Sequence, residues 1–250
     1  MTDRLTRSEV KLVDTLILTY QKHRDQIDLF RNQLLIALAS SADLSEAVHS
    51  IRSRLKDPEH LRDKLVRKLR QCKQEKRAFD IRPESLLIKV NDLVGVRILH
   101  LYTRQIRIID AAVREVFREN KYNLLEGPFA RTWDDESRQF FEDCNIDTQK
   151  SPSMYTSVHY VVGSASRTKV TAEIQVRTLM EEVWGEVNHI MNYPHPIESL
   201  ACREQLKVLA RVTSSASRLV DSIFTTAEDH RKAPSRRPAR RVPVGKNRQC

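Results

Sequence analysis

Two short segments of this chain, residues 155–162 and 168–177, alternate apolar and polar side chains as a β-strand with two unlike faces does. The apolar positions of each segment would face a core. A sheet face turned to water would carry mainly Lys, Thr or Glu, and the second segment taken alone would also fit such a face. The polar face of the two strands together would carry a more varied set: Tyr155, Ser157, His159, Glu173, Gln175 and Arg177.

Helical patterns surround these strands. Apolar residues recur three or four positions apart in the N-terminal segment 8–39. Asp57 followed by Pro58 is typical of a helix start, because Asp caps free N–H groups and Pro suits the first helical position. Further helices are predicted at 104–120, 179–193 and 198–229.

The remaining segments complete the expected sheet. The run 86–102 is rich in Val, Leu and Ile and predicts a buried strand. Residues 124–150 are polar and contain Gly127 and Pro128, so we expect them to be irregular. The pattern indicates an α+β fold with α/β-like features, in which a central mixed sheet of about five strands is flanked by helices.

Composition limits the class of protein. Of the 250 residues 40% are hydrophobic, which is enough to build a core, yet no apolar run approaches a membrane span. The N-terminus lacks the apolar stretch of a signal peptide. We therefore expect a cytoplasmic protein with no membrane partner. Its cysteines, expected to be reduced thiols, are Cys72, Cys144, Cys202 and Cys250.

Positive charge is concentrated at the C-terminus. Of the net charge of +10, eight positive charges lie in residues 231–250, which contain no acidic residue, so the rest of the chain carries only +2. This Pro- and Arg-rich tail is predicted to be disordered. It would be either a solvated terminus or a contact for a polyanion such as RNA. The expected divisions are a helical region at 1–44, a core at 45–197, a helix packed on the core at 198–229 and the tail at 230–250.

Two further groups of charged residues are candidates for chemistry. Asp92 lies at the entrance of the apolar run and Arg97 lies inside it, where a buried charge is costly unless it is paired. The two would form either a structural ion pair or part of a site, and Gly95 between them allows close approach of another group. The start of the predicted helix at residue 57 gathers cations that suit a phosphate site: Arg54, Lys56, Arg62 and Lys64.

The order and spacing of four motifs resemble the synthetase domain of the RelA/SpoT family, the alarmone synthetases. The motifs are SRLKDPEHLRDKL, DLVGVRI, YTSVHYVV and EIQVRTLMEEVWGEVNH, and the resemblance runs from about residue 45 to about residue 195. It implies a nucleotidyltransferase-like synthetase fold. It also implies a GTP pyrophosphokinase, which transfers the β,γ-pyrophosphate of ATP to the ribose 3′-hydroxyl of GDP or GTP to make (p)ppGpp. Such transfer needs Mg²⁺, cations and positioning rather than a protein nucleophile.

The resemblance implies a role for each candidate residue. Asp92 and Glu173 would be the catalytic carboxylates and the Mg²⁺ ligands, and Glu173 would also accept the proton of the 3′-hydroxyl. The implied ATP-binding residues are Arg54 and Arg97, on either side of the adenine, and Lys56 and Lys64, on the phosphates. The implied acceptor-binding residues are Tyr155, stacked on the base, with Ser157, His159, Gln175 and Arg177.

Some positions differ from the usual pattern of that family. Met154 stands where members usually have Gly before the stacking tyrosine, and Asn188 stands where many small synthetases have Glu. These differences concern the acceptor more than ATP. We find no upstream His-Asp pair of the family's hydrolase domain and no room for its C-terminal regulatory domains. The chain therefore resembles a single-domain member that only synthesises.

Other functions stay open at this point. The same donor chemistry would also suit the 3′ end of tRNA or adenine nucleotides, as in toxin-like small synthetases. A third alternative is a non-catalytic RNA-binding or regulatory relative on the same scaffold. The sequence is also compatible with a homo-oligomer.

Overall fold

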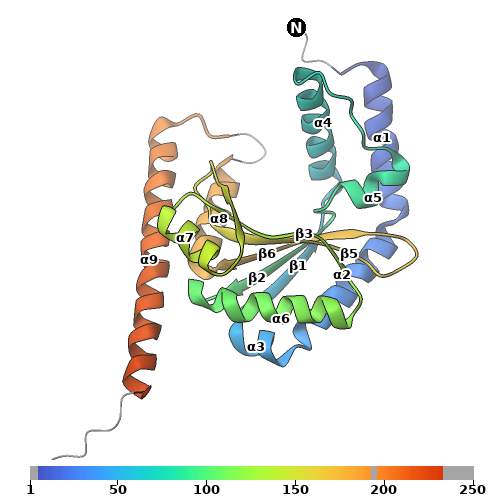
Figure 1. The fold of residues 1–250 in the computed structure, drawn as a ribbon. Coiled ribbons are helices and arrows are strands. Elements are labelled where there is room, and N and C mark those ends of the chain that lie inside the picture. The colour runs from blue at the N-terminus through green and yellow to red at the C-terminus, as the bar shows by residue number, and fades with distance from the viewer. Residues whose placement is uncertain (1–4, 193–195, 233–250) are drawn as a thin grey trace, which may run out of the picture.

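The centre of the protein is a six-stranded mixed sheet with the strand order β1-β2-β6-β5-β3-β4 (Figure 1). The computed structural model describes residues 5–192 and 196–232. The pairs β2–β6 and β3–β4 are parallel, and the other neighbours are antiparallel. The predicted mixed sheet flanked by helices is confirmed, with one strand more than expected. The strands are β1 (Ser50–Leu55), β2 (Val94–His100), β3 (Asn123–Thr132), β4 (Asp147–Lys150), β5 (Ser157–Gly163) and β6 (Thr171–Thr178).

Helices account for most of the remaining described residues. The predicted helices are confirmed with small shifts at their ends, and the N-terminal segment forms two helices that meet at His23. Asp57 is the N-cap that the sequence predicts. The helices are α1 (Arg7–Lys22), α2 (Arg24–Ala39), α3 (Ala42–Ala47), α4 (Pro58–Gln74), α5 (Leu86–Lys89), α6 (Ile106–Glu119), α7 (Asp135–Asp143), α8 (Leu179–Asn192) and α9 (Leu200–Lys232).

Two expectations about local structure were wrong. Residues 124–150 are not irregular, because they contain most of β3 together with α7 and β4. In β3 the short alternation of buried Ala130 and Thr132 with outward Phe129 and Arg131 is enough for a strand that pairs on both sides. The run 86–102 is also not one strand. It begins with α5, whose leucines are buried, and β2 starts only at Val94.

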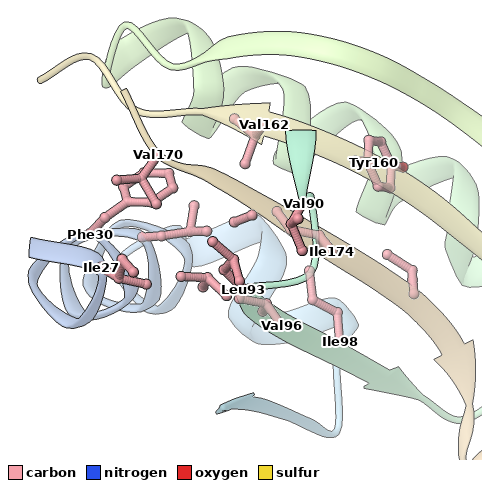
Figure 2. Packing of buried hydrophobic residues seen from close by; sticks show 14 of the residues in the cluster. Ile27, Phe30, Val90, Leu93, Val96, Ile98, Tyr160, Val162, Val170 and Ile174 are labelled. Atoms are coloured by element: carbon pink, nitrogen blue, oxygen red, sulfur yellow. The ribbon is translucent and has the colours of Figure 1, made fainter. Parts of the chain in front are cut away.

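The apolar face of the sheet holds the core. Val96 of β2, Ile174 of β6 and Tyr160 of β5 lie in register and are almost fully buried. Ile27 and Phe30 of α2 lie against this cluster, as Figure 2 shows. On the same side the hydroxyl of Tyr160 donates a hydrogen bond of 2.8 Å to Asp110 of α6. Helices α2 and α6 therefore cover this face and leave the opposite face for other contacts.

The opposite face carries two rows of mostly polar residues. Register places Arg52, Arg97, Gln175, His159 and Phe129 side by side across β1, β2, β6, β5 and β3. Helices α4 and α8 stand on this side of the sheet, away from α6 (Figure 1). The neighbouring row contains Arg54, Gly95 and Glu173.

Three observations bear on the whole chain. No helix in the described part of the chain is long and apolar enough to cross a membrane. Cys72, Cys144 and Cys202 are free thiols, and Cys250 is not among the described residues. Helix α9 runs to Lys232, three residues beyond the end at 229 that the sequence predicts for this helix. The rest of the predicted tail, residues 233–250, lies outside the described residues, and its disorder and its contact with a polyanion stay predictions.

Candidate functional site

A pocket of about 650 Å³, with its solvent-open mouth included, lies over β1, β2 and β6 on the polar face of the sheet. This volume is within the range of small-ligand sites. It brings together Arg54, Asp92, Arg97, Glu173 and Gln175, which the sequence had marked as candidates. The other lining residues are Arg52, Ser53, Gly95 and Val96.

Asp92 is held by two ammonium groups. The Nζ atom of Lys56 lies 2.7 Å from Oδ2, and that of Lys64 lies 2.6 Å from Oδ1. The backbone fixes Lys56, since its N–H donates to the Leu93 carbonyl at 2.9 Å and its carbonyl accepts the Tyr20 hydroxyl at 2.5 Å. Burial alone would raise the pKa of Asp92, but the two lysines outweigh burial and hold that pKa below its usual value.

Arg97 is paired with helix α8 and not with Asp92. Its Nη1 donates to Oε1 of Glu182 at 3.0 Å and also contacts the carboxylate of Glu186. Asp92 is paired with the two lysines instead. The alternative of a structural Asp92–Arg97 ion pair was therefore wrong, and Arg97 remains at the pocket wall.

The cations near the start of α4 have different partners. Arg54 lies over Gly95, where a Cβ atom would be 3.6 Å from Cγ of the arginine. Arg62 pairs with Asp14 of α1 at 2.6 Å and so helps α4 to pack on α1. Asp57 accepts both N–H groups of the first turn of α4, and the Pro residue there has none. The helix N-terminus is thus already capped, which leaves Arg54 and the two lysines on Asp92 as the cations for a phosphate.

Glu173 is joined to β5 through His159. The Nδ1 atom of His159 lies 3.0 Å from Oε1 of Glu173. The Nε2 atom lies 2.5 Å from the hydroxyl of Tyr155 and 2.6 Å from that of Ser157. Burial raises the pKa of Glu173, but the hydrogen bond with His159 outweighs burial, and that pKa lies below its usual value. The shared polar face of the two alternating segments is therefore present.

Glu182 connects two arginines of that face. One carboxylate oxygen accepts from Arg97, and the other lies 2.5 Å from Nη2 of Arg177. Both Glu182 and Arg177 are buried. Burial, followed by the nearby charge of Arg97, lowers the pKa of Arg177. Nothing in the spacing of Glu182 distinguished it from a solvent-exposed glutamate of an amphipathic helix, and the sequence did not reveal this contact.

Trp184 is a second residue of α8 that the sequence did not single out. Its ring is parallel to that of Tyr155, with centroids 6.4 Å apart. Its indole N–H donates to the Leu206 carbonyl of α9 at 3.1 Å. Helix α9 thereby holds α8 against the site, which explains why a long C-terminal helix packs beside the sheet.

Asp92 and Glu173 fit a hard divalent cation. Both carboxylates line the pocket. They interact with one another, since the negative charge of Asp92 raises the pKa of Glu173, although the hydrogen bond with His159 outweighs this effect. Within residues 5–192 and 196–232, no three or more His, Cys, Asp or Glu side chains group to hold a metal by themselves. Mg²⁺ is commonly bound by one or two carboxylates together with substrate phosphates, and this pair of carboxylates suits that arrangement.

Comparison with solved structures relates the fold to known proteins. Small alarmone synthetase 1 from Bacillus subtilis bound to AMPCPP is 16% identical, with a TM-score of 0.57 and coverage of 84% of this chain and 98% of that chain. The same synthetase bound to its product pppGpp is 18% identical, with a TM-score of 0.53 and coverage of 85% and 96%. A GTP pyrophosphokinase family protein from Streptococcus pneumoniae is 18% identical, with a TM-score of 0.56 and coverage of 86% and 97%. These likenesses show a shared fold.

Comparison with sequence families is more direct. A search among curated proteins finds no match to the chain. The family whose sequence model matches is described as the region found in RelA / SpoT proteins, and the match covers residues 53–198. That segment contains the sheet apart from the first three residues of β1, together with α4, α8 and every residue of the pocket except Arg52. Because the match extends over more than half of the sequence, the chain belongs to the RelA/SpoT family.

Proposed function

We propose that this protein transfers the β,γ-pyrophosphate of ATP to the ribose 3′-hydroxyl of GDP or GTP and so makes (p)ppGpp. The observation that carries the proposal is the shared pocket of Asp92 and Glu173 with Arg54 and Arg97. Membership of the RelA/SpoT family supports the same reaction. So does the solved relative from Bacillus subtilis that is bound to its product pppGpp.

The donor side of the site would bind ATP through two arginine and two lysine side chains. Arg54 and Arg97 reach the same pocket, and a guanidinium plane suits stacking on adenine. Lys56 and Lys64 are held at the pocket edge by Asp92 before any phosphate arrives. Phosphate oxygens would then share these ammonium groups with Asp92. Little side-chain entropy is lost on binding, because the lysines are already ordered.

The acceptor side would bind the guanine nucleotide. Tyr155 would stack on the base, with Gln175 and Arg177 beside it, and Ser157 and His159 lie next to the tyrosine. Glu173 would accept the proton of the ribose 3′-hydroxyl as that oxygen attacks the β-phosphorus and AMP leaves. Mg²⁺, held by Asp92 and Glu173, would supply positive charge to the transferring group. Lys and Arg side chains would stabilise the same charge, so no protein nucleophile is needed.

The acceptor is tested with labelled ATP. The full chain is incubated with γ-labelled ATP, Mg²⁺ and, separately, GDP, GTP, ATP or bulk tRNA. We expect GDP or GTP to gain label. Labelling of tRNA or of the adenine nucleotide instead would replace the proposed acceptor, and the absence of label from every acceptor would reject the enzymatic function.

A matched pair of variants keeps that test specific. Glu173→Gln removes the proposed base and Mg²⁺ ligand at nearly constant volume, so transfer is expected to fall at least about a hundredfold. Gln139→Glu makes the opposite exchange, from amide to acid, at an exposed side chain on α7 away from the pocket. It is expected to transfer label as the unchanged chain does. Equal activity of Glu173→Gln and the unchanged chain would refute the assignment of Glu173.

A further inference from the structure

His159 is enclosed by protein on every side. Its exposed fraction is 1%, although it belongs to the polar face of the sheet. The ring of Phe129 from β3 stacks on the imidazole, with centroids 5.3 Å apart and planes 5° apart. The ring of Tyr155 meets the imidazole edge-on at 6.0 Å. Little of the imidazole is therefore left to contact a nucleotide directly.

The contacts of His159 determine which nitrogen carries its proton. The Glu173 carboxylate is ionised near neutral pH and can only accept a hydrogen bond. The Nδ1 atom, 3.0 Å from that carboxylate, must therefore carry the hydrogen. With Nδ1–H directed to the carboxylate, Nε2 is the nitrogen left for the hydroxyls of Tyr155 and Ser157, which lie 2.5 Å and 2.6 Å from it.

We propose that His159 is a positioning residue that connects the stacking tyrosine to the proposed base. Its Nδ1–H holds the Glu173 carboxylate, and its Nε2 accepts the hydroxyl of Tyr155. The tyrosine that would stack on the guanine base and the carboxylate that would accept the 3′-hydroxyl proton are therefore held in one fixed arrangement. The inference rests on the proposed function, in which Glu173 receives the 3′-hydroxyl proton. It assigns His159 a role behind the acceptor site and not a contact with the nucleotide.

Several features of the site make such an anchor necessary. Glu173 extends from the middle of β6 with 24% of its side chain exposed, and the nearby charge of Asp92 repels it. A carboxylate in that setting would otherwise change rotamer or turn away from Asp92. The stacked ring of Phe129 restricts rotation of the imidazole. The guanidinium of Arg131 lies over that Phe129 ring, 5.5 Å from its centroid. The anchor is thus rigid.

Two amide substitutions separate the two ends of the imidazole. The amide nitrogen of Asn occupies about the place of Nδ1, so His159→Asn keeps a donor for Glu173 and loses the contact with the hydroxyls. The amide of Gln reaches about the place of Nε2, so His159→Gln keeps a partner for the hydroxyls and loses the donor for Glu173. If the anchor acts through Glu173, kcat with GDP falls at least about tenfold further in His159→Gln than in His159→Asn. The KM for ATP is expected to stay within about twofold in both variants.

His100 provides a matched control. It is also a buried histidine of the sheet, on β2, and its Nδ1 lies 2.9 Å from the Tyr102 carbonyl, away from the pocket. His100→Asn and His100→Gln remove an imidazole of similar burial. They are expected to show no such difference in kcat from one another. A kcat ratio between the His159 variants equal to that between the His100 variants would overturn the proposal.

A spectroscopic measurement tests the anchor without any substrate. Nitrogen-15 NMR of the labelled, ligand-free chain reports which imidazole nitrogen carries hydrogen. We expect the Nδ1–H tautomer for His159. Loss of the carboxylate in the Glu173→Gln variant is expected to shift the signal of Nδ1, because that nitrogen contacts Glu173. An Nε2–H tautomer in the unchanged chain would overturn the inference. Failure of the chain to transfer pyrophosphate would instead refute the proposed function, while the NMR result would stand on its own.

Discussion

A Cβ atom at Gly185 would lie 2.7 Å from Nη1 of Arg177, so the missing side chain leaves the space that this guanidinium fills. Arg177 is buried, and its Nη2 lies 2.5 Å from Glu182. The guanidinium cannot move aside without losing that partner. The glycine of α8 therefore permits the helix to approach β6 closely enough for Glu182 to reach two arginines.

Gly185→Ala is expected to destabilise the protein despite its position within a helix. Ala stabilises a helix interior by about 1 kcal/mol relative to Gly. Overpacking against the guanidinium costs about 1–3 kcal/mol, which leaves a net loss of up to about 2 kcal/mol. Denaturant unfolding measures the change. In an Arg177→Ala background the same substitution is expected to stabilise, and a gain of about 1 kcal/mol in the unchanged background would contradict the close contact.

Met154 adopts a φ of 58°, a left-handed conformation that favours glycine. It precedes the proposed stacking tyrosine, at the position where the resemblance to the family had led us to expect Gly. Comparison of Met154→Gly with Met154→Ala isolates the backbone, since both variants remove the side chain. We expect the Gly variant to unfold with a free energy about 1 kcal/mol greater than the Ala variant. Equal stability would show that the loop relaxes out of this conformation.

Glu181 makes the stability of the fold depend on pH. Burial raises the pKa of its carboxyl from 4.5 to about 7, against the hydrogen bond that it accepts from the N–H of Thr156. The folded chain binds this proton more tightly than the unfolded chain does. The stabilisation is therefore complete below pH 4.5 and is lost as the pH rises through about 7.

Glu181→Gln is expected to remove that pH dependence, because the amide oxygen can still accept the N–H of Thr156 and does not ionise. Between about pH 5 and about pH 8 the unchanged chain should lose about 2–3 kcal/mol of stability more than the variant. Denaturant unfolding of both chains at the two pH values provides the measurement. Parallel stability curves would mean that Glu181 is solvated and titrates normally.

Arg97→Ala is expected to weaken ATP binding more than acceptor binding. Arg97 borders the pocket and is anchored to α8 by Glu182. The KM for ATP should rise about tenfold or more, while the KM for GDP changes less. Arg118→Ala removes an exposed arginine of α6, paired with Glu115 on the other side of the sheet, and serves as the control. A KM for ATP that does not change in Arg97→Ala would assign this arginine to packing of α8 alone.

Side-chain alternation predicted much of this site. Period-two spacing was sufficient to group Ser157 and His159 on one face and to set Glu173 beside them, because register fixes which residues of paired strands meet. Tyr155 precedes β5, which begins at Ser157 and not at 155 as expected, and reaches His159 through its hydroxyl. Strand β1 was missed, since the two arginines in SIRSRL gave it no apolar run. Those arginines are exposed because they point to the polar face.

Other features depend on tertiary contacts that no local pattern encodes. Glu182 resembles any glutamate of a helix until α9 holds α8 beside the sheet and brings its carboxylate to Arg97. Likewise Leu86 and Leu87 fit a strand by composition, but packing against α1 places them in a short helix. The stacking of Phe129 on His159 follows from the pairing of β3 with β5, and the polar composition of residues 124–150 did not indicate that pairing.

The most direct test of the proposed reaction follows the nucleotide that leaves. The unchanged chain is incubated with ATP, Mg²⁺ and GDP, and AMP, ADP and the guanine product are quantified together. We predict one AMP for each product molecule, no ADP above background, and loss of both when 3′-deoxy-GDP replaces GDP or when Asp92→Asn replaces the unchanged chain. Release of ADP with a singly phosphorylated product, or full turnover with 3′-deoxy-GDP, would contradict pyrophosphate transfer to the 3′-hydroxyl.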